Sequence, residues 1–190
     1  MKEKVNVTGV PETMVQTLYA RAKETRKKNA KINDEIAVEL VKKLDYDFSK
    51  ADKDNAMTYG VIARTIVLDQ MVKQYLEKNA NTVVINIACG LDTRCYRMKG
   101  KYLRWYNVDL PETMKIRSQF LTETDSVYQI AKSAKRLPLT SSRSKHQAMG
   151  ADDAKTARCI RHRPVLVIEN RPCGLHFLPS ARTIGISSVL

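Results

Sequence analysis

The sequence predicts an α/β protein in which amino-terminal helices precede the front half of a doubly wound β-sheet. Two observations carry this prediction. Apolar side chains recur with a helical period up to about residue 78, and short β-branched runs then alternate with a turn and a helix. The chain has 190 residues, of which 43% are hydrophobic and 28% charged, so it can bury a core and fits a single domain.

Three segments of the amino-terminal part carry an apolar stripe with helical spacing. The first begins at Pro11, the second spans residues 34–44, and the third spans residues 56–78. Asn33 or Asp34 is expected to cap the second helix, because a short polar side chain there can accept a backbone hydrogen bond. Residues 45–50, between the second and third helices, are expected to form a loop.

Runs rich in β-branched and aromatic side chains predict three strands of a buried parallel sheet. These runs are 82–87, 102–109 and 127–131. Pro111 is expected to start a helix between the second and third strands, since a residue in the first helical turn needs no backbone N–H. This order of elements is typical of the first half of a doubly wound sheet.

The turn after the first strand contains Gly90, and an acidic residue, Asp109, ends the second strand. Gly90 has no Cβ, so the backbone there can approach a ligand closely. An acid about 20 positions after such a turn is placed to accept hydrogen bonds from ribose hydroxyls. The sequence has no G-x-G-x-x-G phosphate-binding motif. The pattern therefore indicates an adenosine-type ligand without a pyrophosphate rather than NAD or FAD.

Six motifs follow one another in the order found in one known family. They lie at residues 17–25, 36–39, 45–50, 64–69, 88–94 and 105–112. On these motifs, the chain from residue 8 to 132 resembles the class I S-adenosylmethionine-dependent methyltransferases. Within them it is most similar to the leucine carboxyl methyltransferase family, in particular its polyketide O-methyltransferase branch. The resemblance implies a Rossmann-like sheet with an N-terminal helical cover. It also implies methyl transfer from S-adenosyl-L-methionine to a carboxylate or hydroxyl of a small molecule.

The resemblance further implies which residues bind S-adenosyl-L-methionine. Ala88, Cys89 and Gly90 would approach its methionine part, Asp109 would take the ribose, and Leu110 would pack near the adenine. No catalytic residue emerges from the motifs. A carboxylate acceptor is already ionised at pH 7, so catalysis would consist mostly of alignment and desolvation.

Basic residues of the predicted helices and one acid of the tail complete the set of candidates. Arg64 would pair with the cofactor carboxylate, a task suited to a forked guanidinium. Lys23, with Arg21 close by, would face that carboxylate or an acidic substrate. Residues 163–169 look like a later strand of the family that ends in a glutamate near the cofactor, which makes Glu169 a further candidate.

The chain departs from the family at two motif positions and in length. Ala88 stands where the family commonly has glycine, which adds a methyl group at the point of closest cofactor approach. Asn86 stands where an acidic residue or leucine is common. Family members are usually longer, so we expect the sheet to be incomplete at its C-terminal end.

The composition changes after Lys132. Residues 1–132 contain 16 Lys and 7 Arg, whereas residues 133–190 contain 3 Lys and 7 Arg together with all three His. We therefore divide the chain into 1–132, which holds the helices and the first half of the methyltransferase domain, and 133–190, a basic tail with a strand at 164–169. Two interpretations of the tail stay open: translation out of frame, or a loop-rich basic extension.

The net charge of +13 keeps a second function class open, a non-catalytic basic module that binds nucleic acid through the Arg-rich tail. The four cysteines form no C-x-x-C pair, which argues against a zinc site or a disulfide framework. No apolar run reaches the length of a membrane-spanning helix, and the first ten residues lack the apolar run of a secretory signal. The expected location is therefore the cytoplasm.

Overall fold

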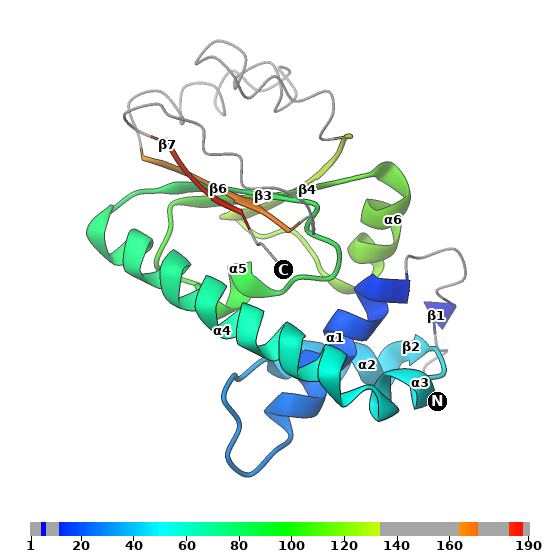
Figure 1. Ribbon diagram of the computed structural model, residues 1–190. Coiled ribbons are helices and arrows are strands. Elements are labelled where there is room, and N and C mark those ends of the chain that lie inside the picture. Colours follow the sequence, from blue (N-terminus) through cyan, green and yellow to red (C-terminus); the bar gives the residue numbers. More distant parts are fainter. Residues whose placement is uncertain (1–4, 7–11, 134–163, 171–182, 188–190) are drawn as a thin grey trace. The chain divides into compact units, whose positions relative to one another are not determined.

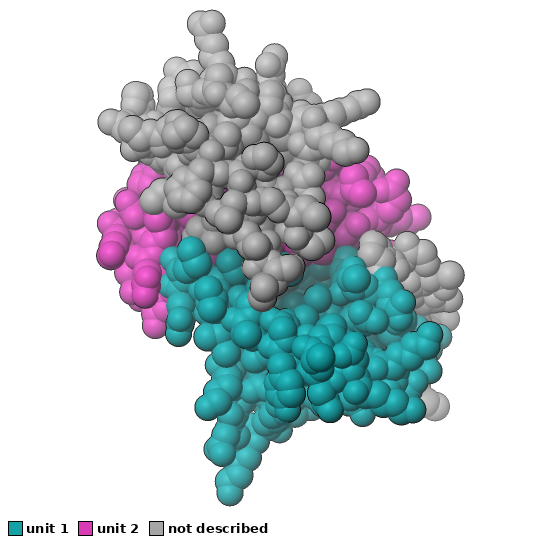
Figure 2. All heavy atoms as spheres, viewed as in Figure 1, with its two compact units in different colours: residues 1–71, 91–97 teal, residues 72–90, 98–190 magenta. Residues whose placement is uncertain are grey.

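The fold is given by a computed structural model, which describes residues 5–6, 12–133, 164–170 and 183–187. The chain divides into two compact units, coloured separately in Figure 2. Unit 1 comprises residues 1–71 and 91–97, and unit 2 comprises residues 72–90 and 98–190. The predicted division into 1–132 and 133–190 stays a prediction, and most of the tail, with its three histidines, lies outside the described residues.

Unit 1 is mainly helical (Figure 1). Its helices are α1 (Glu12–Thr25), α2 (Glu35–Lys43), α3 (Ser49–Lys53), the first part of α4 (Asn55–Lys78) and α5 (Arg94–Arg97). Two short strands, β1 (Val5–Asn6) and β2 (Leu44–Asp45), pair in parallel. The three predicted helices are confirmed as α1, α2 and α4.

The predicted apolar faces and the predicted cap are present in these helices. Met14, Val15 and Leu18 are buried along α1, as the helical spacing requires. Of the two candidates for the cap of α2, Asp34 fills the position, and its Oδ1 accepts a hydrogen bond from the backbone N–H of Ala37 at 3.1 Å. Local periodicity and capping chemistry therefore suffice to define these helices.

The prediction of a loop over residues 45–50 was wrong at both ends. Residues 44–45 belong to β2, and α3 begins at Ser49. Between them, Phe48 stacks on Tyr19 of α1 with ring centroids 4.6 Å apart, and it forms a T-shaped pair with Tyr46 at a centroid distance of 5.0 Å. These aromatic contacts, which sequence periodicity does not reveal, order the segment.

Unit 2 is built on a five-stranded parallel sheet (Figure 1). Its strands are β3 (Val83–Ile87), β4 (Arg104–Asp109), β5 (Val127–Ala131), β6 (Val165–Glu169) and β7 (Thr183–Ser187). They lie side by side in the order β5-β4-β3-β6-β7, and every neighbouring pair is parallel. Counted along the chain within this sheet, the order is third, second, first, fourth, fifth, which is the doubly wound arrangement.

Burial explains why the central strand reads as a nearly unbroken apolar run. All five residues of β3 are buried, as expected for a parallel strand with both faces covered. The polar exception is Asn86, which lies opposite Asn107 of β4 in the parallel register. The strands predicted at 82–87, 102–109, 127–131 and 164–169 are therefore confirmed with small shifts of their ends.

Two features of unit 2 differ from the sequence prediction. Strand β7 was missed, because the run of residues 183–187 lies in the compositionally distinct tail and shows no clear alternation. Helix α6 (Pro111–Phe120) begins at the predicted proline and packs against β5 and β4, but the sequence did not predict that an arginine lies on its buried face. Met114 and Arg117 are buried, whereas Ile116 and Phe120 are only half-buried.

Candidate functional site

The carboxyl edge of the sheet in unit 2 contains a topological switch point. Strand β3 has β4 on one side and β6 on the other, and the chain order reverses there. In open α/β sheets, ligands bind beyond the carboxyl ends of the strands at such a point. The residues that follow β3, β4 and β6 are therefore the strongest candidates for a ligand-binding site.

The turn that follows β3 has an unusual backbone. Ala88 has φ +52° and Gly90 has φ +47°, both in the left-handed region. Glycine adopts this conformation freely, whereas an alanine is strained there by about 1–2 kcal/mol. The backbone conformation at position 88 thus explains why glycine is common there in the family that the sequence resembles. In this chain, Ala88 makes the turn strained.

Asp109, at the end of β4, holds the turn from the neighbouring strand. Its Oδ2 accepts a hydrogen bond from the backbone N–H of Gly90 at 2.7 Å, and its Oδ1 accepts one from the N–H of Leu110 at 2.8 Å. Each carboxylate oxygen has a second lone pair, so both can accept one further hydrogen bond. The glycine turn and the acid predicted from their spacing therefore meet in space.

Helix α6 supports the same turn from its own side. The Sγ of Cys89 lies 3.8 Å from the Sδ of Met114, and Nη1 of Arg117 donates to the backbone carbonyl of Gly90 at 2.7 Å. Arg117 is fully buried. The sequence does not reveal this role of Arg117, because an arginine within an amphipathic helix normally lies on the solvent face.

Buried amide side chains join the strands just below the carboxyl edge. Asn86 Nδ2 donates to Asn107 Oδ1 at 3.1 Å, and Trp105 Nε1 donates to the same oxygen at 3.1 Å. Asn170, directly after β6, donates from its Nδ2 to Asn86 Oδ1 at 2.7 Å. These bonds satisfy polar groups inside the sheet and tie the end of β6 to β3.

Two other candidates follow the strand ends. Leu110 directly follows Asp109 and is 48% exposed, so its side chain offers an apolar surface next to the acid. Glu169 lies beside Ile87 in the parallel register of β6 and β3. The structure thus brings six of the eight predicted site residues to one edge of the sheet: Ala88, Cys89, Gly90, Asp109, Leu110 and, by its backbone, Glu169.

The other two predicted residues, Lys23 and Arg64, belong to unit 1. Lys23 donates from Nζ to both the side chain and the backbone carbonyl of Asp52, each at 2.9 Å. Burial lowers the pKa of Arg64, and the charge of Arg94 lowers it further, while Asp92 opposes this shift.

Unit 1 also contains a buried network of ion pairs that the sequence did not predict. Asp34 Oδ2 accepts from Arg21 Nε at 2.9 Å and from Arg97 Nη1 at 3.0 Å, and Thr93 donates to the same oxygen. Asp69 of α4 accepts from Arg97 and from Arg94. Arg21, which we considered a companion of Lys23, is thus engaged within unit 1.

The same network fixes the residues that follow the glycine turn in the chain. Arg21 donates from Nη2 to the backbone carbonyl of Leu91 at 2.9 Å, and Arg94 pairs with Asp92 at 2.7 Å. Residues 91–97 are therefore bound to helix α1 and to the cap of α2 through charged hydrogen bonds.

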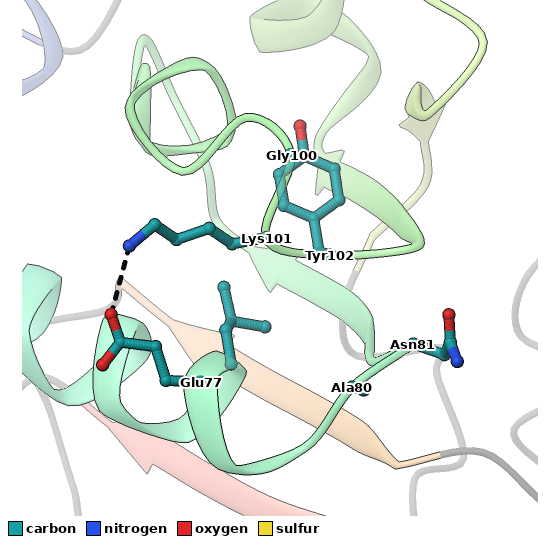
Figure 3. Close-up of a pocket in the computed structure, with 7 residues that line it drawn as sticks. Glu77, Ala80, Asn81, Gly100, Lys101 and Tyr102 are labelled. Atoms are coloured by element: carbon teal, nitrogen blue, oxygen red, sulfur yellow. Dashed lines mark hydrogen bonds and ion pairs between the residues drawn. The ribbon is translucent and has the colours of Figure 1, made fainter.

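A separate pocket of about 370 Å³ lies on the amino side of the sheet, where the chain enters β3 and β4 (Figure 3). It is lined by Leu76, Glu77, Ala80, Asn81, Gly100, Lys101 and Tyr102. Lys101 and Glu77 form an ion pair of 3.2 Å at its side. None of the predicted site residues lines this pocket.

A doubly wound sheet with a glycine turn and a facing acid at its switch point defines the class of nucleoside-binding α/β domains. The particular family follows from sequence comparison. The sequence profile of the leucine carboxyl methyltransferase family matches residues 14–156, and the chain belongs to this family. The match extends beyond Lys132 into the segment of changed composition.

Two curated relatives agree with this assignment. The chain is 36% identical over 137 residues to the tetracenomycin polyketide synthesis O-methyltransferase TcmP of Streptomyces glaucescens, covering 70% of this chain and 50% of that protein. It is 35% identical over 132 residues to the S-adenosyl-L-methionine-dependent methyltransferase dpfgK of Gibberella zeae, covering 64% of this chain and 44% of that protein. The chain thus spans about half the length of these relatives. No helix within the described residues has both the length and the apolar character that crossing a membrane requires.

Proposed function

We propose that this chain carries the cofactor-binding half of an S-adenosyl-L-methionine-dependent O-methyltransferase that acts on a small molecule. The observation that carries the proposal is the 2.7 Å hydrogen bond from Gly90 N–H to Asp109 at the switch point of the sheet. It brings the glycine turn together with Asp109, the acid that would bind the ribose, in a chain that belongs to a methyltransferase family. The names of both relatives, which describe methyltransferases, support the same activity.

The residues at the carboxyl edge fit the parts of this cofactor. The turn of Ala88, Cys89 and Gly90 would lie against the methionine part, where the lack of a side chain at Gly90 permits close approach. Asp109 keeps one lone pair on each oxygen for the two ribose hydroxyls. Leu110 would cover one face of the adenine with its exposed side chain.

Three further assignments rest on the family resemblance. Glu169 is the last residue of β6, the strand adjacent to β3, and a glutamate there would add a second acid to the cofactor site. Arg64 would pair with the carboxylate of the methionine part, and Lys23 would attract the same group or an acidic acceptor. Replacement of Arg64 by Met should weaken binding of a ligand with that carboxylate and leave adenosine binding unchanged.

The reaction requires little acid–base chemistry from the protein. Bound S-adenosyl-L-methionine supplies an electrophilic methyl group on a sulfonium. Asp109 and the glycine turn would fix the nucleoside and the amino-acid part, so that the acceptor oxygen can approach in line. We favour a carboxylate as the acceptor over a hydroxyl, because a carboxylate is already ionised at neutral pH and can attack the methyl group without a general base.

Calorimetric titration of the full chain with S-adenosylhomocysteine tests the proposal. We expect binding in the micromolar range, and Asp109→Asn should weaken it by about tenfold or more, because a charged acceptor is lost. Asp125→Asn, on the exposed loop before β5, is the matched control and should leave the affinity unchanged.

The result that contradicts the proposal is an absence of binding by the wild-type chain. If DNA binding that falls steeply with salt were found instead, the alternative of a basic nucleic-acid-binding module would be supported. Binding of S-adenosylhomocysteine without methyl transfer to any carboxylic acid would indicate a chain that keeps only the cofactor site.

A further inference from the structure

The fully buried guanidinium of Arg117 lies directly at the glycine turn. Its Nη1 donates to the carbonyl oxygen of Gly90 at 2.7 Å, a distance typical of a strong charged hydrogen bond. Burial of a charged side chain is costly and is rare unless polar groups engage it. Burial of an arginine at this position therefore indicates that its hydrogen bonds have a specific role, beyond filling space in the core.

Gly90 is held at both of its backbone polar groups. Its N–H is bound by Asp109 and its carbonyl by Arg117. Both side chains come from one continuous segment, the end of β4 and the helix α6 that follows it. Because Pro111 is in the first turn of α6, the start of the helix is fixed, and the helix holds its side chains at a set distance from Asp109.

The turn needs such support. Ala88 adopts a left-handed conformation that is unfavourable for alanine, so the backbone would relax to another conformation if it were free. Met114 contacts Cys89 from the same face of α6 that carries Arg117. Helix α6 thus contacts two successive residues of the turn.

We propose that Arg117 is a positioning residue that holds the Gly90 turn in its ligand-binding conformation. The inference deepens the proposed function and rests on it. Arg117 acts through Gly90, so its effect on the cofactor would be indirect. Its loss should let the turn leave the conformation that fits the amino-acid part of S-adenosyl-L-methionine, and affinity should fall although no contact to the ligand is removed.

The test compares variants of the full chain in their affinity for S-adenosylhomocysteine. Arg117→Met removes the charge and the donors at similar length, and Arg117→Lys keeps a charge and a donor. Leu121→Ala, a buried position at the end of α6, is the control for destabilisation without contact to the turn. We expect Arg117→Met to weaken binding by about tenfold to a hundredfold. Arg117→Lys should recover part of this loss, and Leu121→Ala should keep the wild-type affinity below its melting temperature.

Hydrogen exchange of the Gly90 amide gives a readout that needs no ligand. If Arg117 holds the turn, Arg117→Lys should speed exchange at Gly90 by about tenfold relative to Ile85 within β3, a pattern that global destabilisation would not produce. This measurement also decides the case in which Arg117→Met does not fold. Equal affinity of the Arg117 and Leu121 variants, or uniform exchange along β3 and the turn, would overturn the inference. A different outcome is also possible: the wild type does not bind the ligand, but Arg117→Lys shows faster exchange selectively at Gly90. This combination would refute only the proposed function.

Discussion

The two units keep polar groups in their interiors in different ways. Buried charged residues of unit 1 belong mostly to one network of ion pairs. They are Arg21, Glu24, Asp34, Asp92 and Arg94. In unit 2, the buried polar groups are chiefly neutral amides and hydroxyls, and Arg117 is the sole charged residue of the described part that is buried there.

This difference distinguishes charged residues that stabilise the fold from charged residues that lie next to the proposed binding site. In unit 1 the arginines and aspartates satisfy one another, so the network holds helices and residues 91–97 together. In unit 2, Arg117 and Asp109 converge on a single glycine turn at the edge of the sheet where we propose that the cofactor binds. Substitutions in unit 1 should therefore change stability first, and substitutions at this edge should change ligand affinity first.

The largest effect on stability is expected from Asp34→Ala in unit 1. Removal of this carboxylate leaves Arg21 and Arg97 without their shared partner and removes the cap of α2. Breaking a buried ion pair in this way costs about 3–5 kcal/mol of the free energy of unfolding. Denaturant unfolding measures it. The control is Glu39→Ala, which breaks an exposed pair with Lys42 and should cost no more than about 0.5 kcal/mol. Equal losses would contradict the contrast between buried and exposed pairs.

A smaller loss of unfolding free energy is expected from Asn107→Leu in unit 2. Asn86 and Trp105 both donate to the Asn107 side chain, and a leucine would leave these two buried donors without that acceptor. The expected cost is about 2–3 kcal/mol. Asn55→Leu, at an exposed position, should change the unfolding free energy by less than about 0.5 kcal/mol. If Asn107→Leu were neutral, the buried amides would have no structural role.

The pH dependence of stability should identify the Asp34 network. Burial alone would raise the pKa of Asp34, but the charges of Arg21 and Arg97 and the hydrogen bond from Thr93 outweigh it and hold the pKa below its ordinary value of 3.8. The contribution of Asp34 is thus present above that value and is lost as the pH falls through the lower folded-state pKa. The stability difference between wild type and Asp34→Asn should narrow as the pH is lowered from 5 to 2. A constant difference would exclude this titration.

The smallest effect, and one of opposite sign, is expected from Ala88→Gly. Glycine relieves the left-handed strain at position 88, and this gain offsets its greater loss of conformational entropy on folding. We expect the unfolding free energy to stay constant or to rise by up to about 1 kcal/mol. Ala63→Gly, at an exposed position within α4, should instead cost about 1 kcal/mol, as measured by thermal unfolding. A similar loss in both variants would disprove strain at the turn.

Most of the regular structure could be predicted from local patterns in the sequence. Helical spacing predicted α1, α2 and α4, and β-branched runs predicted β3, β4 and β5, because each element is defined by neighbours within a few residues. The proximity of the Gly90 turn and Asp109 could also be predicted, since adjacent parallel strands bring their carboxyl ends to one edge, but their direct hydrogen bond could not.

The features that were missed depend on contacts between distant residues. Helix α5 has only four residues and no periodic signal of its own, and it is held by Asp34 and Asp69 from other helices. Burial of Arg117 depends on where α6 packs, which its own sequence does not show. Contacts between residues far apart in the chain cannot be predicted from the local pattern of a single segment.

The order of the strands has a consequence for synthesis of the chain. Asn170, directly after β6, bonds to Asn86 of β3, a separation of 84 positions along the chain. A ribosome that adds 5–20 residues per second would make this stretch in roughly 4–17 s. During that time, one edge of β3 has no neighbour and is open to pairing with other nascent chains. Chaperones that shield exposed strand edges should therefore raise the yield of this protein.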